Sequence, residues 1–286
     1  MAKLTISQLK QRWETDEGKS LLQAVIKALK KGRDLTEISS LKHHEGKVDL
    51  RGISFPKEYN EFFNYKTSKY IKWADGSLKF EESKLQNIDF SYSDIQVTTW
   101  EKCSFIDCLF YQVDARTITF IACEFLNVIF KNTRFSYGYL NIRKGKLSGS
   151  FKNVSFIKSQ FSETRSSFPI IDNCLFEDCN FYAADFDGSR FSNTKFKGVL
   201  NCPWFRKHSK NEFEPNYFFN RIDKSKFTNE MLNVDFSEAT LEYVGFSNDL
   251  DLKDCKLPLH IKIERFEMDK SSYFVSSEIT SNPVQT

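Results

Sequence analysis

Residues 78–140 read LKFEESKLQNIDFSYSDIQVTTWEKCSFIDCLFYQVDARTITFIACEFLNVIFKNTRFSYGYL, and a large apolar residue returns at every fifth position. The series consists of Phe80, Leu85, Phe90, Ile95, Trp100, Phe105, Phe110, Phe120, Phe125, Phe130, Phe135 and Leu140, with the small Ala115 as its one exception. Two positions before each large residue the side chain is usually small, as at Ser83, Cys103 and Thr133. Helices repeat every 3.6 residues and strands every 2, so neither element explains a period of five. A fixed period of this kind indicates a repeat architecture.

The period continues on both sides of this segment. It begins at Leu50 and Phe55 and is lost and regained several times before it fades near Leu257. We therefore predict one repeat region over residues 48–257, with insertions at 57–75 and 201–219 and phase breaks near 145, 167 and 235. The insertion at 57–75 is expected to fold back on the repeats. Later large residues expected in the core are Phe176, Phe181, Phe186, Phe191 and Phe196.

The five-residue units resemble those of the pentapeptide repeat family, whose unit is written A(D/N)LXX. A good match is Ala184-Asp185-Phe186-Asp187-Gly188. The resemblance implies an all-β solenoid, a right-handed quadrilateral β-helix with four pentads in each coil. Residues twenty apart would then stack on successive coils, which would place Phe90, Phe110 and Phe130 in one column.

The two ends of the chain are predicted to cap this solenoid. In residues 1–47, Thr5 and Gln8 have the spacing of a capping box, and residues 19–31 carry an apolar stripe at helical spacing. We interpret this region as an N-terminal α-helical cap, because the terminal coil of a solenoid needs a cover. A partner-binding helical module is the alternative. Residues 258–286 are interpreted as a short strand cap and a polar tail.

The cysteines and histidines do not indicate a catalytic or metal site. Six of the seven cysteines occupy the small position of a repeat, where a free thiol packs as a small apolar group. Cys103 and Cys123 would lie on adjacent coils, close enough for a disulfide, which a cytosolic setting disfavours. His43 and His44 are adjacent and have no cysteine nearby, so a loop pair is favoured over a ligand pair. We therefore predict no metal, no cofactor and no enzymatic activity.

Charge and hydrophobicity place further limits on function. The net charge is +3, too small to indicate a nucleic-acid or membrane partner by itself. The sequence has no apolar run of signal-peptide or membrane-spanning length, so we expect a cytoplasmic protein without a membrane partner.

Two segments are candidate protein-binding sites. The stretch 131–165 is strongly basic, and its phase break contains Arg143, Lys144 and Lys146. The insertion at 201–219 combines aromatic and basic residues, and its candidate anchors are Trp204, Phe205, Arg206, Lys207 and His208. In the alternative interpretation, the charges are scattered and solvated, and the aromatic rings of the insertion fold onto the rod.

The favoured function is a non-enzymatic scaffold for protein–protein interaction, with an unidentified protein partner. The family resemblance offers an alternative, because some pentapeptide repeat proteins mimic duplex DNA and bind DNA gyrase or related topoisomerases. Mimicry needs an excess of acidic residues, whereas residues 78–200 have a nearly balanced charge. Nucleic-acid binding through the 131–165 stretch is a weaker possibility.

Overall fold

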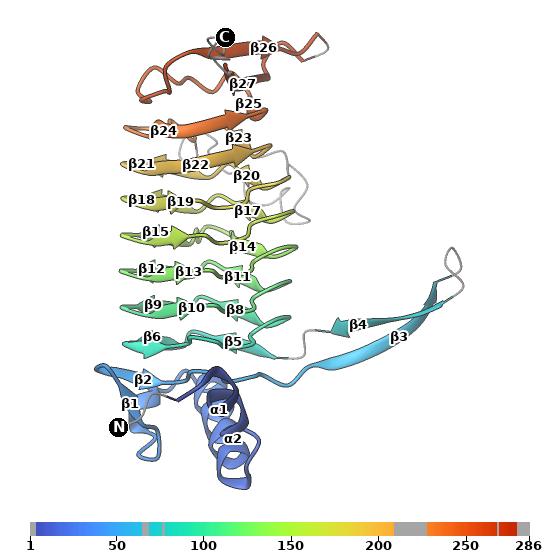
Figure 1. Ribbon diagram of the computed structural model, residues 1–286, viewed down its shortest axis with the longest axis vertical. Helices are drawn as coiled ribbons and strands as arrows, with labels where there is room; N and C mark the ends of the chain where they lie inside the picture. Colours follow the sequence, from blue (N-terminus) through green and yellow to red (C-terminus); the bar gives the residue numbers. More distant parts are fainter. Residues whose placement is uncertain (1–3, 65–68, 76–77, 209–227, 268, 279–286) are drawn as a thin grey trace, which may run out of the picture.

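The computed structural model is a rod of stacked coils with helices at one end and an antiparallel strand pair at the other (Figure 1). It describes residues 4–64, 69–75, 78–208, 228–267 and 269–278. The N-terminal elements are α1 (Ile6–Gln11), α2 (Asp16–Lys30) and the short 3-10 helix η1 (Leu35–Glu37). Three sides of the rod are sheets whose strands run parallel from coil to coil.

The first sheet has nine strands, in the order β1 (His43–His44), β2 (Lys47–Asp49), β7 (Ile88–Asp89), β10 (Leu109–Tyr111), β13 (Ile129–Lys131), β16 (Ser155–Ile157), β19 (Leu175–Glu177), β22 (Lys195–Asn201) and β24 (Asp235–Glu242). The second has ten, in the order β26 (Ile261–Arg265), β27 (Tyr273–Ser277), β25 (Val244–Ser247), β23 (Trp204–Arg206), β20 (Asp185–Asp187), β17 (Arg165–Ser167), β14 (Tyr139–Ile142), β11 (Thr119–Ile121), β8 (Thr99–Glu101) and β5 (Lys79–Glu81). The third has six, in the order β21 (Arg190–Ser192), β18 (Ile170–Asp172), β15 (Ser150–Lys152), β12 (Glu124–Leu126), β9 (Ser104–Ile106) and β6 (Lys84–Gln86).

The fourth side is built from single bridges between coils instead of named strands. These parallel bridges connect Ser54, Asp94, Asp114, Arg134, Gln160 and Asn180 in succession. With four sides to each coil, the predicted right-handed quadrilateral β-helix with an N-terminal α-helical cap is confirmed.

The large residues of the repeat form ring ladders inside the rod. Phe110 stacks between Phe90 and Phe130, with ring centroids 4.9 and 4.6 Å apart. This column continues without interruption through the later coils, and its members are Phe90, Phe110, Phe130, Phe156, Phe176, Phe196 and Phe236. The predicted stacking of residues twenty apart is therefore confirmed.

Where the small inward residue is Ser, Thr or Cys, it has a polar role that the sequence interpretation missed. In several of these units its hydroxyl or thiol donates a hydrogen bond to the carbonyl oxygen of a large residue 23 positions earlier. Thr133 Oγ1 donates to Phe110 O at 3.1 Å, and Cys108 Sγ donates to Leu85 O at 3.4 Å. Other units fill the same position with a purely apolar residue, as at Val113 and Val128.

The corners of the rod place many non-glycine residues in the left-handed backbone region, two positions after each large residue. One corner carries a column of asparagines, which tolerate this conformation better than most residues. Their side-chain amides are bonded along the rod: Asn127 Nδ2 donates to Asp107 Oδ1 at 3.1 Å, Asn153 Nδ2 to Asn127 Oδ1 at 3.1 Å, and Asn173 Nδ2 to Asn153 Oδ1 at 2.7 Å. These hydrogen bonds connect the same corner of successive coils on the outer surface of the rod.

The phase break near 145 is a small hairpin that leaves the first and third sheets in register, whereas the register of the second sheet shifts at β14. Lys144 and Leu147 exchange two backbone hydrogen bonds at its base. Asn141 is fully buried, and its side chain accepts from Cys123 N at 2.7 Å and donates to Cys123 O at 2.9 Å. Gly149 is required beside it, because a Cβ there would lie 2.0 Å from Asn141 Oδ1.

The predicted break near 167 is not a loss of phase. Ser166 occupies the position of a large residue, is buried, and pairs in register with Phe186 on the next coil. Its hydroxyl oxygen lies 2.9 Å from that of Ser189. Near 235, by contrast, the register between β22 and β24 does shift, between Lys195 and Lys197.

The two predicted irregular regions near the N-terminus also differ in detail from expectation. Helix α2 starts at Asp16 instead of near residue 19, because the Thr15 side chain caps it by accepting from Gly18 N at 3.0 Å. The 57–75 insertion contains β3 (Glu58–Asn64) and β4 (Lys69–Asp75), which pair with each other in a separate antiparallel sheet.

Replacing Phe110 by Ala should lower the free energy of unfolding by about 3–5 kcal/mol, because a ring in the middle of a ladder is lost and a cavity remains. Chemical denaturation followed by circular dichroism would measure this. Tyr182→Ala is the control, since Tyr182 is 55% exposed and its loss should change stability only slightly. Equal effects of the two substitutions would contradict the inward assignment of Phe110.

Candidate functional site

The structure corrects the position of the second insertion. Residues 204–206 form β23, an in-register strand between β20 and β25, and not a protruding loop. Phe205 is fully buried and stacks on Phe186 at 5.2 Å and on Phe246 at 5.4 Å. It therefore belongs to a core ladder and is unavailable as a binding anchor. The rest of the predicted insertion, from residue 209, lies outside the described residues.

Trp204 and Arg206 point to the outer side of the same strand, but other side chains hold them there. Arg206 is buried, donates to both carboxylate oxygens of Asp185 at 2.8 Å, and has its guanidinium carbon 4.9 Å from the centre of the Trp204 ring. Trp204 packs against Phe266 at 6.0 Å and Phe274 at 5.4 Å, both in the C-terminal segment. These contacts attach the strand cap β26–β27 to the coils.

The remaining two predicted anchors follow β23. Lys207 Nζ donates to Asp249 O at 3.5 Å. His208 is described and has an interaction of its own, so it is not a free side chain.

Gly245→Ala should destabilise the C-terminal end by about 1–3 kcal/mol, because the new Cβ would lie 2.5 Å from the Trp204 ring. The free energy of unfolding measures this effect. The double variant Gly245→Ala/Trp204→Ala removes the clash, so adding Gly245→Ala to Trp204→Ala should have much less effect. If the two substitutions are additive, the contact between Gly245 and Trp204 is not the cause.

The hairpin at 143–148 separates the three other predicted binding residues. Arg143 is buried, with its guanidinium carbon 4.8 Å from the centre of the Phe168 ring. Lys144 forms an ion pair with Glu101, and Lys79 forms a second ion pair with the same carboxylate at 2.8 Å. These two hydrogen-bonded lysines lower the pKa of Glu101. Lys144 and Lys146 are both exposed, and Lys146 lies at the tip of the hairpin.

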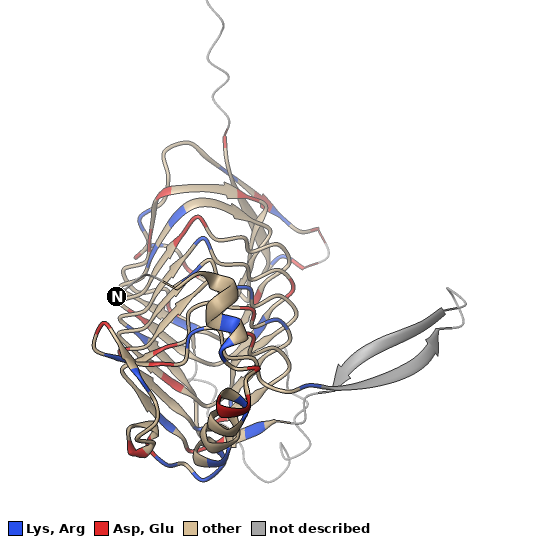
Figure 2. Ribbon diagram, turned by 60° about the horizontal axis from the view of Figure 1, so that its bottom comes forward, with Lys and Arg blue, Asp and Glu red and all other residues tan. Residues whose placement is uncertain are grey.

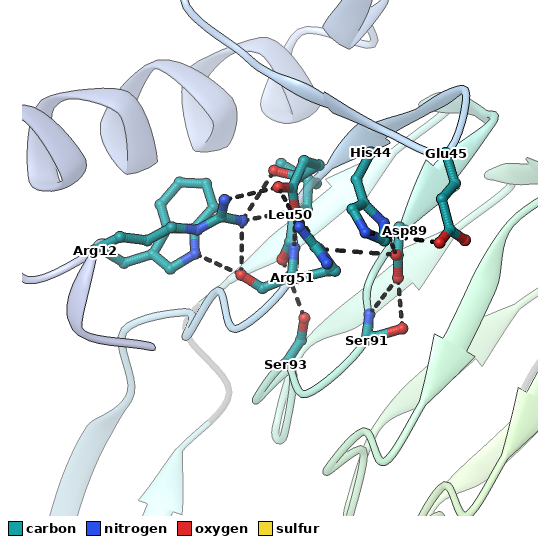
Figure 3. A network of polar contacts seen from close by, with 10 residues as sticks. Arg12, His44, Glu45, Leu50, Arg51, Asp89, Ser91 and Ser93 are labelled. Atoms are coloured by element: carbon teal, nitrogen blue, oxygen red, sulfur yellow. Dashed lines mark hydrogen bonds and ion pairs between the residues drawn. The ribbon is translucent and has the colours of Figure 1, made fainter. Parts of the chain in front are cut away.

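The most extensive described polar network joins the helical cap to the first coil (Figure 3). Arg12, which follows α1, donates from both terminal nitrogens to Asp49 at 2.8 Å, and it also reaches the backbone oxygen of Arg51 at 2.8 Å. The Trp13 indole donates to that same oxygen at 2.9 Å. The Arg51 guanidinium also donates to the Asp49 carboxylate, at 2.9 and 3.0 Å.

The network extends to the second coil through Asp89. This carboxylate accepts from Ser91 N at 2.9 Å and lies 3.5 Å from His44 Nδ1 and 3.9 Å from Arg51 Nε. The sequence interpretation singled out His44 but missed the roles of Arg12, Asp49 and Arg51. The partners of this network lie up to 45 positions apart, as His44 and Asp89 do, and no sequence period relates the helix to the coil.

Beside this network, α2 and the first coil border an open groove of about 850 Å³. Trp13, Leu21 and Asp49 are among its lining residues, and Asp16, Glu17 and Lys42 add charges of both signs. Because Asp49 and Arg12 bind each other, the network stabilises the cap junction and presents no free charge of one sign to a ligand.

The charge of Asp49 is strongly stabilised in the folded protein. Burial by itself raises its pKa, but hydrogen bonds from Arg51 and Arg12 outweigh burial and hold the pKa well below its usual range. A lowered folded-state pKa stabilises the fold above the unfolded value of about 3.9, and this stabilisation is lost as the pH falls below it.

Asp49→Asn should therefore destabilise the protein by about 2–3 kcal/mol at pH 7. The difference from wild type should shrink as the pH falls below about 4, because wild-type Asp49 then becomes protonated in the unfolded state. Denaturation at a series of pH values would measure this. Asp251→Asn, at an exposed carboxylate, is the control, and a difference independent of pH would rule out the charge as the source.

Most inward thiols are suited to packing, while a hydrogen bond with the Cys123 thiol lowers the pKa of Cys103. Burial raises the pKa of Cys108, Cys174 and Cys179 to about 12, so these groups stay protonated at neutral pH. All seven cysteines are free. Within the described ranges, no cluster of three or more His, Cys, Asp or Glu is arranged to hold a metal ion. None of the described helices has the length and apolar character needed to cross a bilayer.

Acidic and basic residues are interspersed along the coils, as Figure 2 shows. Many of them are paired across coils. Asp114 binds both Arg116, at 2.9 Å, and Arg134, and Glu238 binds both Lys195 and Lys197. The basic stretch 131–165 therefore does not form a single belt, because its members are distributed over several sides of the rod.

Four inward columns, corners at intervals of five and a coil of about twenty residues define a β-helix built from pentapeptide units. Residues 167–199 match the family model for pentapeptide repeats, in eight copies. The chain therefore contains pentapeptide repeats, and the resemblance inferred from its sequence is confirmed. No curated protein matches the chain.

Two solved structures are similar to parts of this chain. The trypsin-treated form of QnrB1, a plasmid-mediated fluoroquinolone resistance protein, is 15% identical over 71% of this chain and 92% of its own, with a TM-score of 0.28. HetL, a pentapeptide repeat protein involved in heterocyst differentiation regulation from the cyanobacterium Nostoc sp. strain PCC 7120, is 13% identical over 63% of this chain and 83% of its own, with a TM-score of 0.27. At such TM-scores neither likeness carries an argument about function.

Proposed function

We propose that this protein is a cytoplasmic, non-enzymatic scaffold that binds another protein through its outer surface. The observation that carries this proposal is that large side chains fill the interior of the coils. In the column that runs from Phe90 to Phe236, every ring is at most 2% exposed. A coil interior filled in this way leaves the outer sides, corners and projecting turns for recognition. Repeat rods offer such extended surfaces to protein partners.

The charge pattern supports this scaffold over a DNA-mimicking gyrase ligand. Mimicry of duplex DNA requires a long face of unpaired negative charge, since the phosphates of DNA are regularly spaced anions. Here the outward acids Glu101, Asp114, Asp185 and Glu238 each bind one or two cations of the same chain. These pairs neutralise the sites at which a mimic would need free carboxylates.

The test is affinity capture from the native host with the full chain as bait, followed by a binding isotherm for each captured protein after purification. The scaffold proposal expects at least one saturable protein complex, which a Phe110→Ala bait destabilised in its core should retain poorly at raised temperature. If no purified candidate binds, the proposal is wrong. A DNA supercoiling assay with gyrase belongs beside it, because inhibition there would favour the alternative.

A further inference from the structure

One corner of the rod combines exposed tyrosines with arginines on two successive coils. Its members are Arg134, Tyr137, Tyr139 and Arg165, which we call the tyrosine–arginine corner. Tyr139 lies in β14 directly beside Arg165 in β17, and their side chains share the outer side of that sheet. Arg134 lies on the adjoining bridged side, and Tyr137 is at the bend between the two sides.

The two rings are among the most exposed large side chains of the described residues. Tyr137 is 58% exposed and Tyr139 is 45% exposed. They are also held in place by the backbone. Tyr137 has a left-handed φ of 62°, and Gly138 fits the inward position between them, where a Cβ would lie 2.8 Å from Phe135 O. The backbone of this bend therefore places both residues on the outer surface.

The corner has an excess of positive charge. Asp114 is the nearest acid to Arg134, but it also binds Arg116 through two contacts of 2.9 Å, so this group of three retains a net charge of +1. Arg165 has no ion pair within the described ranges. Its neighbour on the next coil, Asp185, is already bound by both nitrogens of Arg206. Glu163, exposed at the same bend, is the acid left to oppose these arginines.

The chemistry of these side chains indicates what they would bind. Tyr and Arg are the residue types most often found as anchors at the centre of protein interfaces. A guanidinium binds a carboxylate through two parallel hydrogen bonds, while a neighbouring ring covers the apolar part of the partner. Duplex DNA fits less well, because its binding draws on many phosphate contacts and this corner has only two arginines.

We propose that the tyrosine–arginine corner is the site where this scaffold binds its partner, and that the partner contributes an acidic, partly apolar peptide segment. This inference rests on the proposed scaffold function. In the bound state, Arg134 and Arg165 pair with carboxylates of the segment, and Tyr137 and Tyr139 pack against its apolar side chains. The ring contacts supply affinity, and the arginines supply the preference for negative charge.

The test uses a library of random dodecapeptides, selected on the full-length wild-type chain and on three variants. Tyr137→Ala/Tyr139→Ala removes the rings, and Arg134→Glu/Arg165→Glu reverses the charge. Tyr243→Ala/Lys253→Glu is the matched control, since it removes an equally exposed ring and a cation far along the rod. Thermal unfolding checks that all four proteins fold alike.

The proposal expects the wild type and the control to enrich peptides with a net negative charge and at least one large apolar residue. For the best peptide, measured by fluorescence anisotropy, each corner variant should weaken binding by about tenfold or more. Charge reversal should also shift the selected peptides towards a positive charge. Affinity should fall as salt is raised, because the pairs are partly exposed.

Three results would overturn this inference. In the first, the wild type and the charge-reversed variant select the same peptides. In the second, the peptides selected by the wild type are basic or neutral. In the third, the corner variants bind the best peptide as well as the control does. A labelled DNA duplex is run alongside, and tighter binding of DNA than of peptide at the corner would point to a nucleic-acid site instead. If affinity capture finds a partner that binds the corner variants normally, the scaffold stands and the corner is excluded. If no partner is found at all, the scaffold proposal itself fails.

Discussion

Stacking of aromatic rings along the axis of the rod is the interaction on which the other features depend. Successive coils are separated by one strand spacing, roughly 4.8 Å. The rings of Phe105 and Phe125 lie 4.7 Å apart and 3° from parallel, close to that spacing. A phenyl ring in every coil thus fits the space between its neighbours above and below, and it buries most of its surface in doing so. This explains why one residue type dominates the core of so long a segment.

The same spacing accounts for the polar details around the core. A coil that turns four times in twenty residues has to bend every five, and the large residue of a short strand has its carbonyl within reach of a small inward side chain of the next coil. The small inward side chains bond to these carbonyls, as Thr194 does to Ile171 O at 3.3 Å. The corner asparagines bond along the rod outside the core. Core, bend and corner are therefore three consequences of one repeat unit.

At the phase break after Leu140, the first and third sheets continue in register, and the irregularity is confined to β14 in the second sheet. The additional residues after Leu140 leave as a hairpin, and the buried Asn141 amide takes over the backbone bonds of Cys123. At the N-terminus, the cap is joined by charge: Arg12 and Arg51 enclose Asp49. At the C-terminus, aromatic contacts attach the strand cap to the coils: the Trp204 ring packs against Arg206 on one strand and against Phe274 of the cap. The surface left free by these attachments includes the corner formed by Tyr137 and Tyr139.

The sequence alone determined the repeat, the inward residues and the helical cap, because a core position needs the same kind of side chain in every coil and therefore leaves a period. It also identified the breaks near 145 and 235, whereas the break predicted near 167 is in register and residues 204–206 of the predicted second insertion form a core strand. Only the tertiary structure decided which outward side chains come together, since residues on neighbouring coils are about twenty positions apart and no pattern requires them to match. For that reason Phe205 moved from a predicted loop into the core, Arg143 was found buried, and Arg12 was found bound to Asp49. The inward side of each unit is dictated by packing against its own repeats, whereas its outward side is set by neighbours that the local sequence does not specify.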